Sequence, residues 1–350
     1  MASLTETAYY ARNTIKFGAI GIVVFFVLRA GVSAGVAYWK KLHPPPPPPP
    51  TVSFGQLPAM VFPALPQPTV TYTLETVTGA TPDLGDRASV YFMPVRTASL
   101  LGLERTANLA SKLEFRQKYE QLSPTRYRWV KNDPLPATLT ADIISGSFTV
   151  EVAWNSDPAL LFARDVPNET LALDETKNWL QNLGLLADDL QNGASKITYL
   201  RADINDLVKA VSLSEADFVR VDLFRAPIDL VPVYPANPDR GIVSIVFSGE
   251  NSAGKRVVDV NYNYFPVTME QSATYPIITT QEAWAKLQSG QGYIARLDVN
   301  VKNVVVRRIS LGYYDSAIPQ HFLQPIFIFE GDNNFVGYVQ AINAKWIIEN

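Results

Sequence analysis

Three stretches near the carboxyl end predict successive β-strands: Val304-Val-Val-Arg-Arg-Ile-Ser-Leu-Gly-Tyr-Tyr314, Leu323-Gln-Pro-Ile-Phe-Ile-Phe-Glu330 and Phe335-Val-Gly-Tyr-Val-Gln-Ala-Ile342. Aromatic and β-branched residues dominate them, as is typical of strands. Pro325 is compatible with a strand because a proline at the first position removes no ladder hydrogen bond. Neighbouring side chains in a strand point to opposite faces, so we expect Arg307 and Arg308 to diverge, with one of them paired to an acid such as Glu330.

The segments upstream of these stretches alternate between helical and strand patterns from about residue 70. Apolar residues at helical spacing predict three helices, each with a residue that can cap its amino end: Ser99–Tyr119, Asp174–Leu186 and Thr280–Gln288, with Ser99, Asp174 and Thr280 as caps. Strands are expected over Val70–Val77, Ser89–Val95, Tyr127–Val130, Thr138–Ile144, Ser147–Trp154, Lys196–Ala202, Phe218–Phe224, Val231–Val233, Gly241–Phe247, Arg256–Phe265, Val301–Tyr314, Gln324–Glu330, Phe335–Ile342 and Lys345–Ile348.

Each predicted helix is followed by two or more strands, which gives the chain a weak internal repeat. The predicted fold class is therefore α+β, with antiparallel sheets and short helices. We expect three modules, over residues 70–170, 171–272 and 273–350. They follow a tail and membrane anchor over 1–43 and a proline-rich linker over 44–69.

Near the amino end, Phe17–Trp39 is a run of 23 residues with a single charge, Arg29. A helix of this length measures about 35 Å and can cross a hydrocarbon core of roughly 30 Å. A cleaved signal peptide is the alternative, but the run is long and no clear small-x-small site ends it. We expect an uncleaved, single-pass anchor in the cell membrane. Basic residues balance on its two sides, so the short tail and large following domain favour a domain outside the cytoplasm.

Small residues surround the charge in this helix. Gly31 and Gly35 have the GxxxG spacing that allows close helix packing in lipid, so Arg29, Gly31 and Gly35 are candidates for a helix–helix contact and for homo-oligomer formation. The alternative is an ordinary anchor whose Arg29 snorkels to the interface.

Seven consecutive prolines, Pro44–Pro50, follow the anchor. They predict a polyproline II spacer that rises about 3.1 Å per residue and extends roughly 20 Å. A proline-rich ligand for an SH3-type partner is the less favoured alternative, since the run adjoins the membrane and lacks a flanking basic pattern.

The composition excludes several kinds of chemistry. The chain has no cysteine and two histidines, which excludes disulfides, thiolate metal sites and a histidine cluster. The net charge is −3 and the first 50 residues carry +4, so the remaining 300 carry −7, which disfavours nucleic-acid binding. No catalytic motif is present. We expect no catalytic residue, metal or cofactor, and we interpret Asp188-Asp189 and Asp203–Asp206 as solvated acids rather than metal ligands.

The last 75 residues, with the motifs around Leu311-Gly-Tyr-Tyr314, Pro325-Ile-Phe-Ile-Phe-Glu330 and Tyr338-Val339, resemble a PepSY-like module. They are similar to the final domain of the YycH/YycI-type regulators. The resemblance implies a membrane-anchored extracytoplasmic protein that binds an envelope protein, which in that family is a sensor histidine kinase. The polyproline spacer departs from the family pattern.

These observations favour a non-enzymatic binding and regulatory protein with an envelope protein as partner. Tyr313, Tyr314, Asp315 and His321 are the candidates for a partner surface, because aromatic residues on strands are common in protein interfaces. The alternative is a structural component of an envelope assembly such as a pilus, secretion or cell-wall complex. An envelope hydrolase is a third hypothesis, which the shortage of catalytic side chains disfavours.

Overall fold

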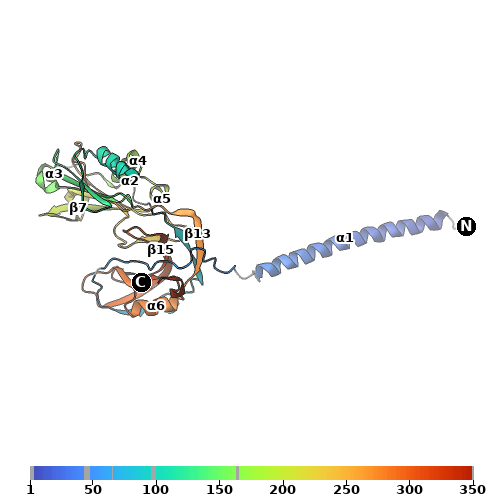
Figure 1. Ribbon diagram of the computed structural model, residues 1–350. Coiled ribbons are helices and arrows are strands. Elements are labelled where there is room, and N and C mark those ends of the chain that lie inside the picture. The colour runs from blue at the N-terminus through green and yellow to red at the C-terminus, as the bar shows by residue number, and fades with distance from the viewer. Residues whose placement is uncertain (1–3, 43–47, 65, 96–99, 163–164, 349–350) are drawn as a thin grey trace. The chain divides into compact units, whose positions relative to one another are not determined.

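The computed structural model describes residues 4–42, 48–64, 66–95, 100–162 and 165–348 (Figure 1). The chain forms two compact units, Met1–Pro49 and Pro50–Asn350. The first unit contains helix α1 (Leu4–Leu42), and its part from Ala8 to Lys41 is long and apolar enough to cross a membrane. The predicted span Phe17–Trp39 lies inside this helix. Lys40 and Lys41 occupy its last turn, where cations interact favourably with the helix dipole.

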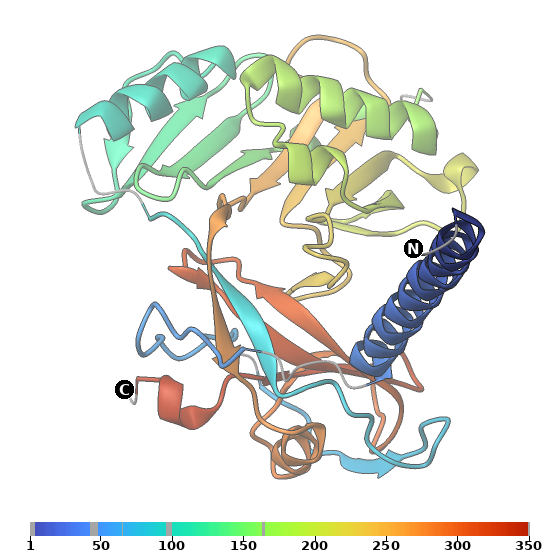
Figure 2. The ribbon, with the colours of Figure 1, turned by 90° about the vertical axis from the view of Figure 1, so that its right-hand side faces the viewer.

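The second unit is mixed α+β and contains a nine-stranded antiparallel sheet. Its strands lie in the order β3 (Glu120–Gln121), β4 (Arg126–Lys131), β5 (Ala137–Asp142), β6 (Phe148–Val152), β12 (Val257–Tyr262), β11 (Val243–Ser248), β9 (Phe218–Leu223), β7 (Ser195–Asp203) and β8 (Asp206–Lys209). Figure 2 shows helices α2 (Leu100–Lys112) and α4 (Glu169–Leu183) over one face of this sheet. Short helices α3 (Ala159–Phe162) and α5 (Asp188–Gln191) and the 3-10 turns Trp154–Ser156 and Leu213–Glu215 complete this part.

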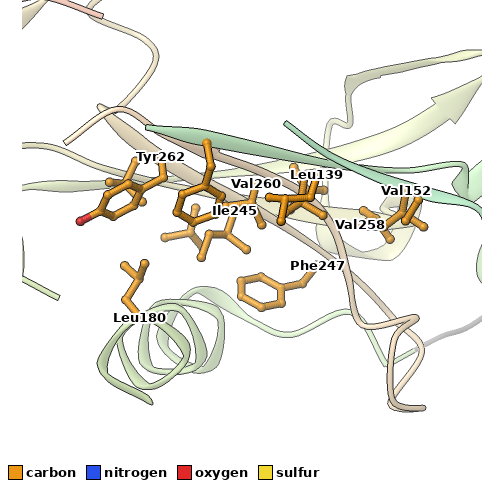
Figure 3. Close-up of a cluster of buried hydrophobic side chains, with 14 of the residues drawn as sticks. Leu139, Val152, Leu180, Ile245, Phe247, Val258, Val260 and Tyr262 are labelled. Carbon is orange, nitrogen blue, oxygen red and sulfur yellow. The ribbon is translucent and has the colours of Figure 1, made fainter. Parts of the chain in front are cut away.

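The core of this part lies between the helices and the sheet. Leu180 of α4 faces Ile245 and Phe247 of β11 and Val260 of β12 (Figure 3), and all four side chains are at most 1% exposed. Strand β11 is buried at every position because it lies between β9 and β12 inside the sheet, and four of its six residues are apolar.

A six-stranded sheet forms the other large part of the unit. Its main path is β1 (Thr71–Leu74), β15 (Asn303–Asp315), β17 (Pro325–Gly331), β18 (Val336–Gln340) and β14 (Tyr293–Arg296), and β10 (Val233–Pro235) also pairs with β15. Strands β1 and β10 run parallel to β15, whereas β17 runs antiparallel to it. Helix α6 (Thr280–Gln288) buries Ala283 and Leu287 in the core of this part. A three-stranded sheet contains β13 (Thr268–Pro276), β2 (Arg87–Phe92) and β16 (Phe322–Leu323).

Most predicted elements are present, with shifted ends. Helix α6 has the predicted bounds, but its cap is Thr279, which forms a capping box with Glu282. Helix α4 begins earlier than predicted, because Asn168 rather than Asp174 caps it by accepting a hydrogen bond from the Leu171 amide.

Ser99 lies outside the described residues. The strand predicted over Lys345–Ile348 is wrong, since Ala344–Trp346 form a 3-10 turn. Strand β13 was not predicted.

The three predicted modules do not correspond to three sheets. Strands on both sides of the boundary at residue 170 join in the nine-stranded sheet, where β6 pairs with β12. Strands β1 and β2, which lie in the predicted first module, pair with β15 and β13. Short-range patterns locate strands, but they do not determine which distant strands pair.

The linker predicted over residues 44–69 is also shorter in the structure. Residues 51–63, here called the strap, pack against later parts of the second unit. The amide of Val52 donates to the carbonyl of Thr274 (3.0 Å), and the amide of Leu57 donates to the carbonyl of Trp346 (2.8 Å). Leu57 is 0% exposed, and Phe62 stacks on Tyr293 with ring centroids 5.0 Å apart. The proline pattern alone gave no indication of these contacts.

Replacement of Leu57 by alanine tests whether the strap belongs to the fold. Removing a fully buried leucine leaves a cavity and should lower the free energy of unfolding by about 2–5 kcal/mol. Chemical denaturation of the full chain in detergent measures the change. The control is Val61→Ala in the same strap, where the side chain is 57% exposed and the expected effect is under about 0.5 kcal/mol. Equal effects of the two substitutions would contradict a structural role for the strap.

Candidate functional site

A cleft of about 480 Å³ lies beside helix α2 in the second unit. Its rim includes exposed residues of α2, namely Arg105, Asn108 and Lys112. The turn between β5 and β6, the end of α4 and the loop residues Pro319 and Gln320 also line it. The floor of the cleft consists of Tyr262, Tyr264 and Phe265, of which Tyr262 and Phe265 are buried.

Close backbone packing sets the position of α2 beside the cleft. A Cβ atom at Gly102 would lie 2.8 Å from the carbonyl oxygen of Ile143, so only glycine allows this approach. The following turn is held by Asp142, whose Oδ1 accepts hydrogen bonds from the amides of Ile144 (2.9 Å) and Ser145 (2.8 Å). Burial alone would raise the pKa of Asp142, but these donors and Thr125 lower it overall. The carboxylate of Asp142 is therefore engaged in holding the turn.

The end of α4 fixes a second side of the cleft. Gly184 ends the helix with a φ of 73°, the left-handed conformation that glycine adopts without strain. The chain then turns so that the carbonyl of Leu185 accepts a hydrogen bond from the Tyr262 hydroxyl at 3.0 Å. This bond connects the helix end to the last residue of β12 and to the floor.

A buried ion cluster supports the floor from behind. The Nε of Arg225 donates to Oδ2 of Asp315 at 2.8 Å, and its Nη2 donates to the carbonyl oxygen of Phe265 at 2.7 Å. Its Nη1 donates to Asp189. The guanidinium also lies 4.8 Å from the ring centroid of Tyr264, a cation–π contact. Arg225 thereby positions two of the three floor residues.

Burial determines the electrostatics of this cluster. The side chains of Arg225 and Asp315 are each 1% exposed. Burial raises the pKa of Asp315 above its ordinary value, and the nearby Arg225 opposes this rise. Burial lowers the pKa of Arg225, but the carboxylates of Asp315 and Asp189 outweigh it and raise that pKa overall. The Oδ1 atoms of Asp189 and Asp315 have no hydrogen-bond partner among the described residues.

The floor and rim of the cleft provide binding groups. Burial, with a contribution from Asp189, raises the pKa of Tyr264 to about 12, so this phenol is neutral at physiological pH. Within the described parts of the chain, no three histidines or acids are grouped closely enough to hold a metal ion. The cleft lining contains no histidine. The arrangement provides apolar contact, hydrogen bonds and two positive charges.

The structure buries most of the predicted partner surface. Tyr313, Tyr314 and Asp315 are 3%, 1% and 1% exposed, so they do not present a surface to a partner. Both tyrosine rings pack against other aromatics, Tyr313 on Tyr91 and Tyr314 on Phe62. Asp315 instead belongs to the ion cluster. His321 is exposed, as a surface residue would be.

The other candidates are not among the residues that line the cleft. Arg29, Gly31 and Gly35 are exposed on α1 in the first unit. Asp203 and Asp206 face each other across the β7–β8 turn. One of the two neighbouring arginines was expected to pair with an acid such as Glu330, and Arg308 does so at 2.6 Å. Arg307 also pairs, with Glu75 and Asp332.

Sequence reasoning missed both the cleft and Arg225. The only local signal was a lone arginine among apolar residues in Phe224-Arg-Ala-Pro-Ile228. A charge in such a stretch is almost never fully buried unless it is paired, which could have prompted a search for acidic partners. Those partners lie 36 and 90 residues away, so the spacing could not identify them.

Comparisons with known proteins add little to this geometry. No protein-family model matches the chain, and no curated protein matches it. Among solved structures, the chain is similar to an uncharacterized protein from Eubacterium rectale ATCC 33656, with 12% sequence identity and a TM-score of 0.39. The alignment covers 74% of this chain and 82% of that chain. A similarity at this level defines no family.

Replacement of Arg225 by methionine tests the ion cluster. The substitution leaves Asp315 buried without its counter-charge, and we expect a loss of about 3–5 kcal/mol in the free energy of unfolding near pH 7. Without the arginine the pKa of Asp315 rises further. Protonation then favours the folded state, and the loss should shrink as pH falls toward 4.

Denaturation curves from pH 4 to 8 measure this dependence. The control is Arg308→Met, in which the lost arginine is 69% exposed and pairs with Glu330 at the surface. It should cost about 1 kcal/mol or less. A loss for Arg225→Met that does not depend on pH would contradict the account of the cluster.

Proposed function

We propose that this chain is a non-enzymatic, membrane-anchored binding protein whose large domain lies outside the cytoplasm and regulates an envelope protein. The observation that carries the proposal is the cleft beside α2. It combines an aromatic floor, a cationic rim and a buried cluster that fixes the floor in place. Rigid, partly apolar clefts with a few oriented polar groups are typical of binding sites.

The amino-terminal helix supports the membrane part of the proposal. Helix α1 is long and apolar enough to span a bilayer.

The resemblance to PepSY-like modules and YycH/YycI-type regulators supports the regulatory part. The motifs that carry it fall on β15, β17 and β18, which are neighbours in one sheet. A sensor histidine kinase is the partner that this resemblance suggests. The cleft is lined by other residues, so its proposed role in binding is independent of this resemblance.

Self-association in an envelope assembly is the second candidate function. Gly31 and Gly35 lie one turn apart on α1, and a Cβ atom added at either glycine would meet no other side chain of this helix within 4 Å. Such a face allows close approach of another helix. Native mass measurement in detergent tests it, since a stoichiometric homo-oligomer is expected for an assembly component and a monomer would contradict it.

In-cell crosslinking followed by affinity purification tests the binding function. One variant, Asn108→Trp, places a bulky side chain on the rim of the cleft at an exposed position. Its control, Ser111→Trp, changes an exposed residue of the same helix that does not line the cleft. A third variant replaces residues 17–39 by a poly-leucine span.

We expect a dominant crosslinked protein with the unmodified chain and with Ser111→Trp, and at least a several-fold loss with Asn108→Trp. Retention of the partner by the poly-leucine variant would assign recognition to the outer domain, and its loss would assign a share to α1. Two outcomes would contradict a binding role for the cleft. One is the absence of any crosslinked partner, and the other is equal capture of the partner by the unmodified chain, Asn108→Trp and Ser111→Trp.

A further inference from the structure

The charged residues of α2 that line the cleft are both positive. Arg105 and Lys112 are exposed, and neither forms an ion pair among the described residues. The one acidic residue that lines the cleft is Asp142, whose carboxylate already accepts hydrogen bonds from Thr125, Ile144 and Ser145. The positive charge is therefore available to a ligand.

This charge is local, because the chain beyond residue 50 carries a net −7. A long polyanion such as a nucleic acid would meet repulsion outside the cleft. A short acidic segment that fits within the rim would not. Charge complementarity thus selects a ligand with a few negative groups.

The spacing of the two cations indicates the size of the ligand. Arg105 and Lys112 are seven residues apart on α2, which corresponds to about 10 Å along the helix axis at 1.5 Å per residue. An extended peptide in the polyproline II conformation rises about 3.1 Å per residue with three residues per turn, so side chains at positions i and i+3 lie on the same side, about 9 Å apart. Two acidic side chains at these positions match the two cations.

Apolar surface accompanies these two charges. Leu109 lies between them along α2, Tyr264 lines the same cleft, and both side chains are only partly buried. They leave room for apolar side chains between the acidic ones. Asn108, also on the rim, is placed to hydrogen-bond peptide backbone, since an amide side chain both donates and accepts.

We infer that the cleft binds an extended peptide segment of a partner protein in which two acidic residues flank two apolar ones. The inference rests on the proposed binding function and adds the chemical class of the ligand. Arg105 and Lys112 bind the acidic side chains, and Leu109 and Tyr264 contact the apolar pair. Arg225 is a positioning residue that acts through Tyr264 and Phe265.

Fluorescence anisotropy with the full chain in detergent tests this inference. The probe is a fluorescein-labelled peptide, Gly-Glu-Leu-Phe-Glu-Gly, compared with the same peptide carrying Gln in place of both Glu residues. The charge-reversed protein is Arg105→Glu with Lys112→Glu. Its matched control is Arg201→Glu with Lys209→Glu, which makes the same charge change at two exposed positions on β7 and β8. Circular dichroism verifies that each variant is folded.

The acidic peptide should bind the unmodified chain at least tenfold more tightly than its Gln counterpart. The charge-reversed protein should lose at least tenfold in affinity, whereas the matched control should lose less than twofold. Binding should also weaken between 50 and 500 mM salt, because the rim charges are exposed to screening. Equal binding of the two peptides, or an unchanged affinity after charge reversal, would overturn the inference.

The crosslinking experiment separates this inference from the proposed function. If Asn108→Trp loses the partner while Arg105→Glu with Lys112→Glu retains it, the cleft binds a partner without acidic recognition. The inference would then be wrong and the proposed function would stand. If no partner depends on the cleft, the proposed function itself would be contradicted.

Discussion

The buried guanidinium of Arg225 is the interaction on which the arrangement of the second unit depends. It follows the end of β9 in the nine-stranded sheet and binds Asp315 at the end of β15 in the six-stranded sheet. The same group binds Asp189 of α5 and the carbonyl of Phe265 after β12. Removing a charge from water is expensive, so one arginine with several oriented acceptors fixes the positions of all these segments. The contacts of Arg225 with Phe265 and Tyr264 also fix the position of the cleft floor.

Strand β15 has a comparable role within its own sheet. It pairs with β1, β10 and β17, so strands from widely separated parts of the chain meet on it. Tyr313 and Tyr314 are buried because segments on both sides cover this strand, including the strap through Phe62. An aromatic pair that looks suited to an interface is thus part of the core. The binding groups instead lie on a short helix whose sequence shows no special motif.

The features that the sequence predicts are those set by interactions between residues close together in the chain. The α+β class, helix α6, the long apolar helix and most strands follow from periodicity and residue preference within short windows. The pairing of β1 and β2 with distant strands, the docking of the strap and the partners of Arg225 depend on contacts between residues far apart in the sequence. Strand β13 was missed because its exposed first half, Thr268–Ser272, lacks apolar alternation. The cleft was missed because its lining comes from six segments that are separate in the sequence.

The strap also determines the order in which this protein can fold during synthesis. It is the first part of the second unit to emerge from the ribosome, yet Leu57 forms hydrogen bonds with Trp346 and Ile348 at the far end of the chain. Strand β1 likewise cannot form its strand pairing until β15 has been synthesised. Contacts so distant in sequence close slowly. A nascent chain therefore exposes Leu57 and Phe62 until the distant segments that cover them have been synthesised, and these exposed apolar side chains are targets for chaperones and proteases.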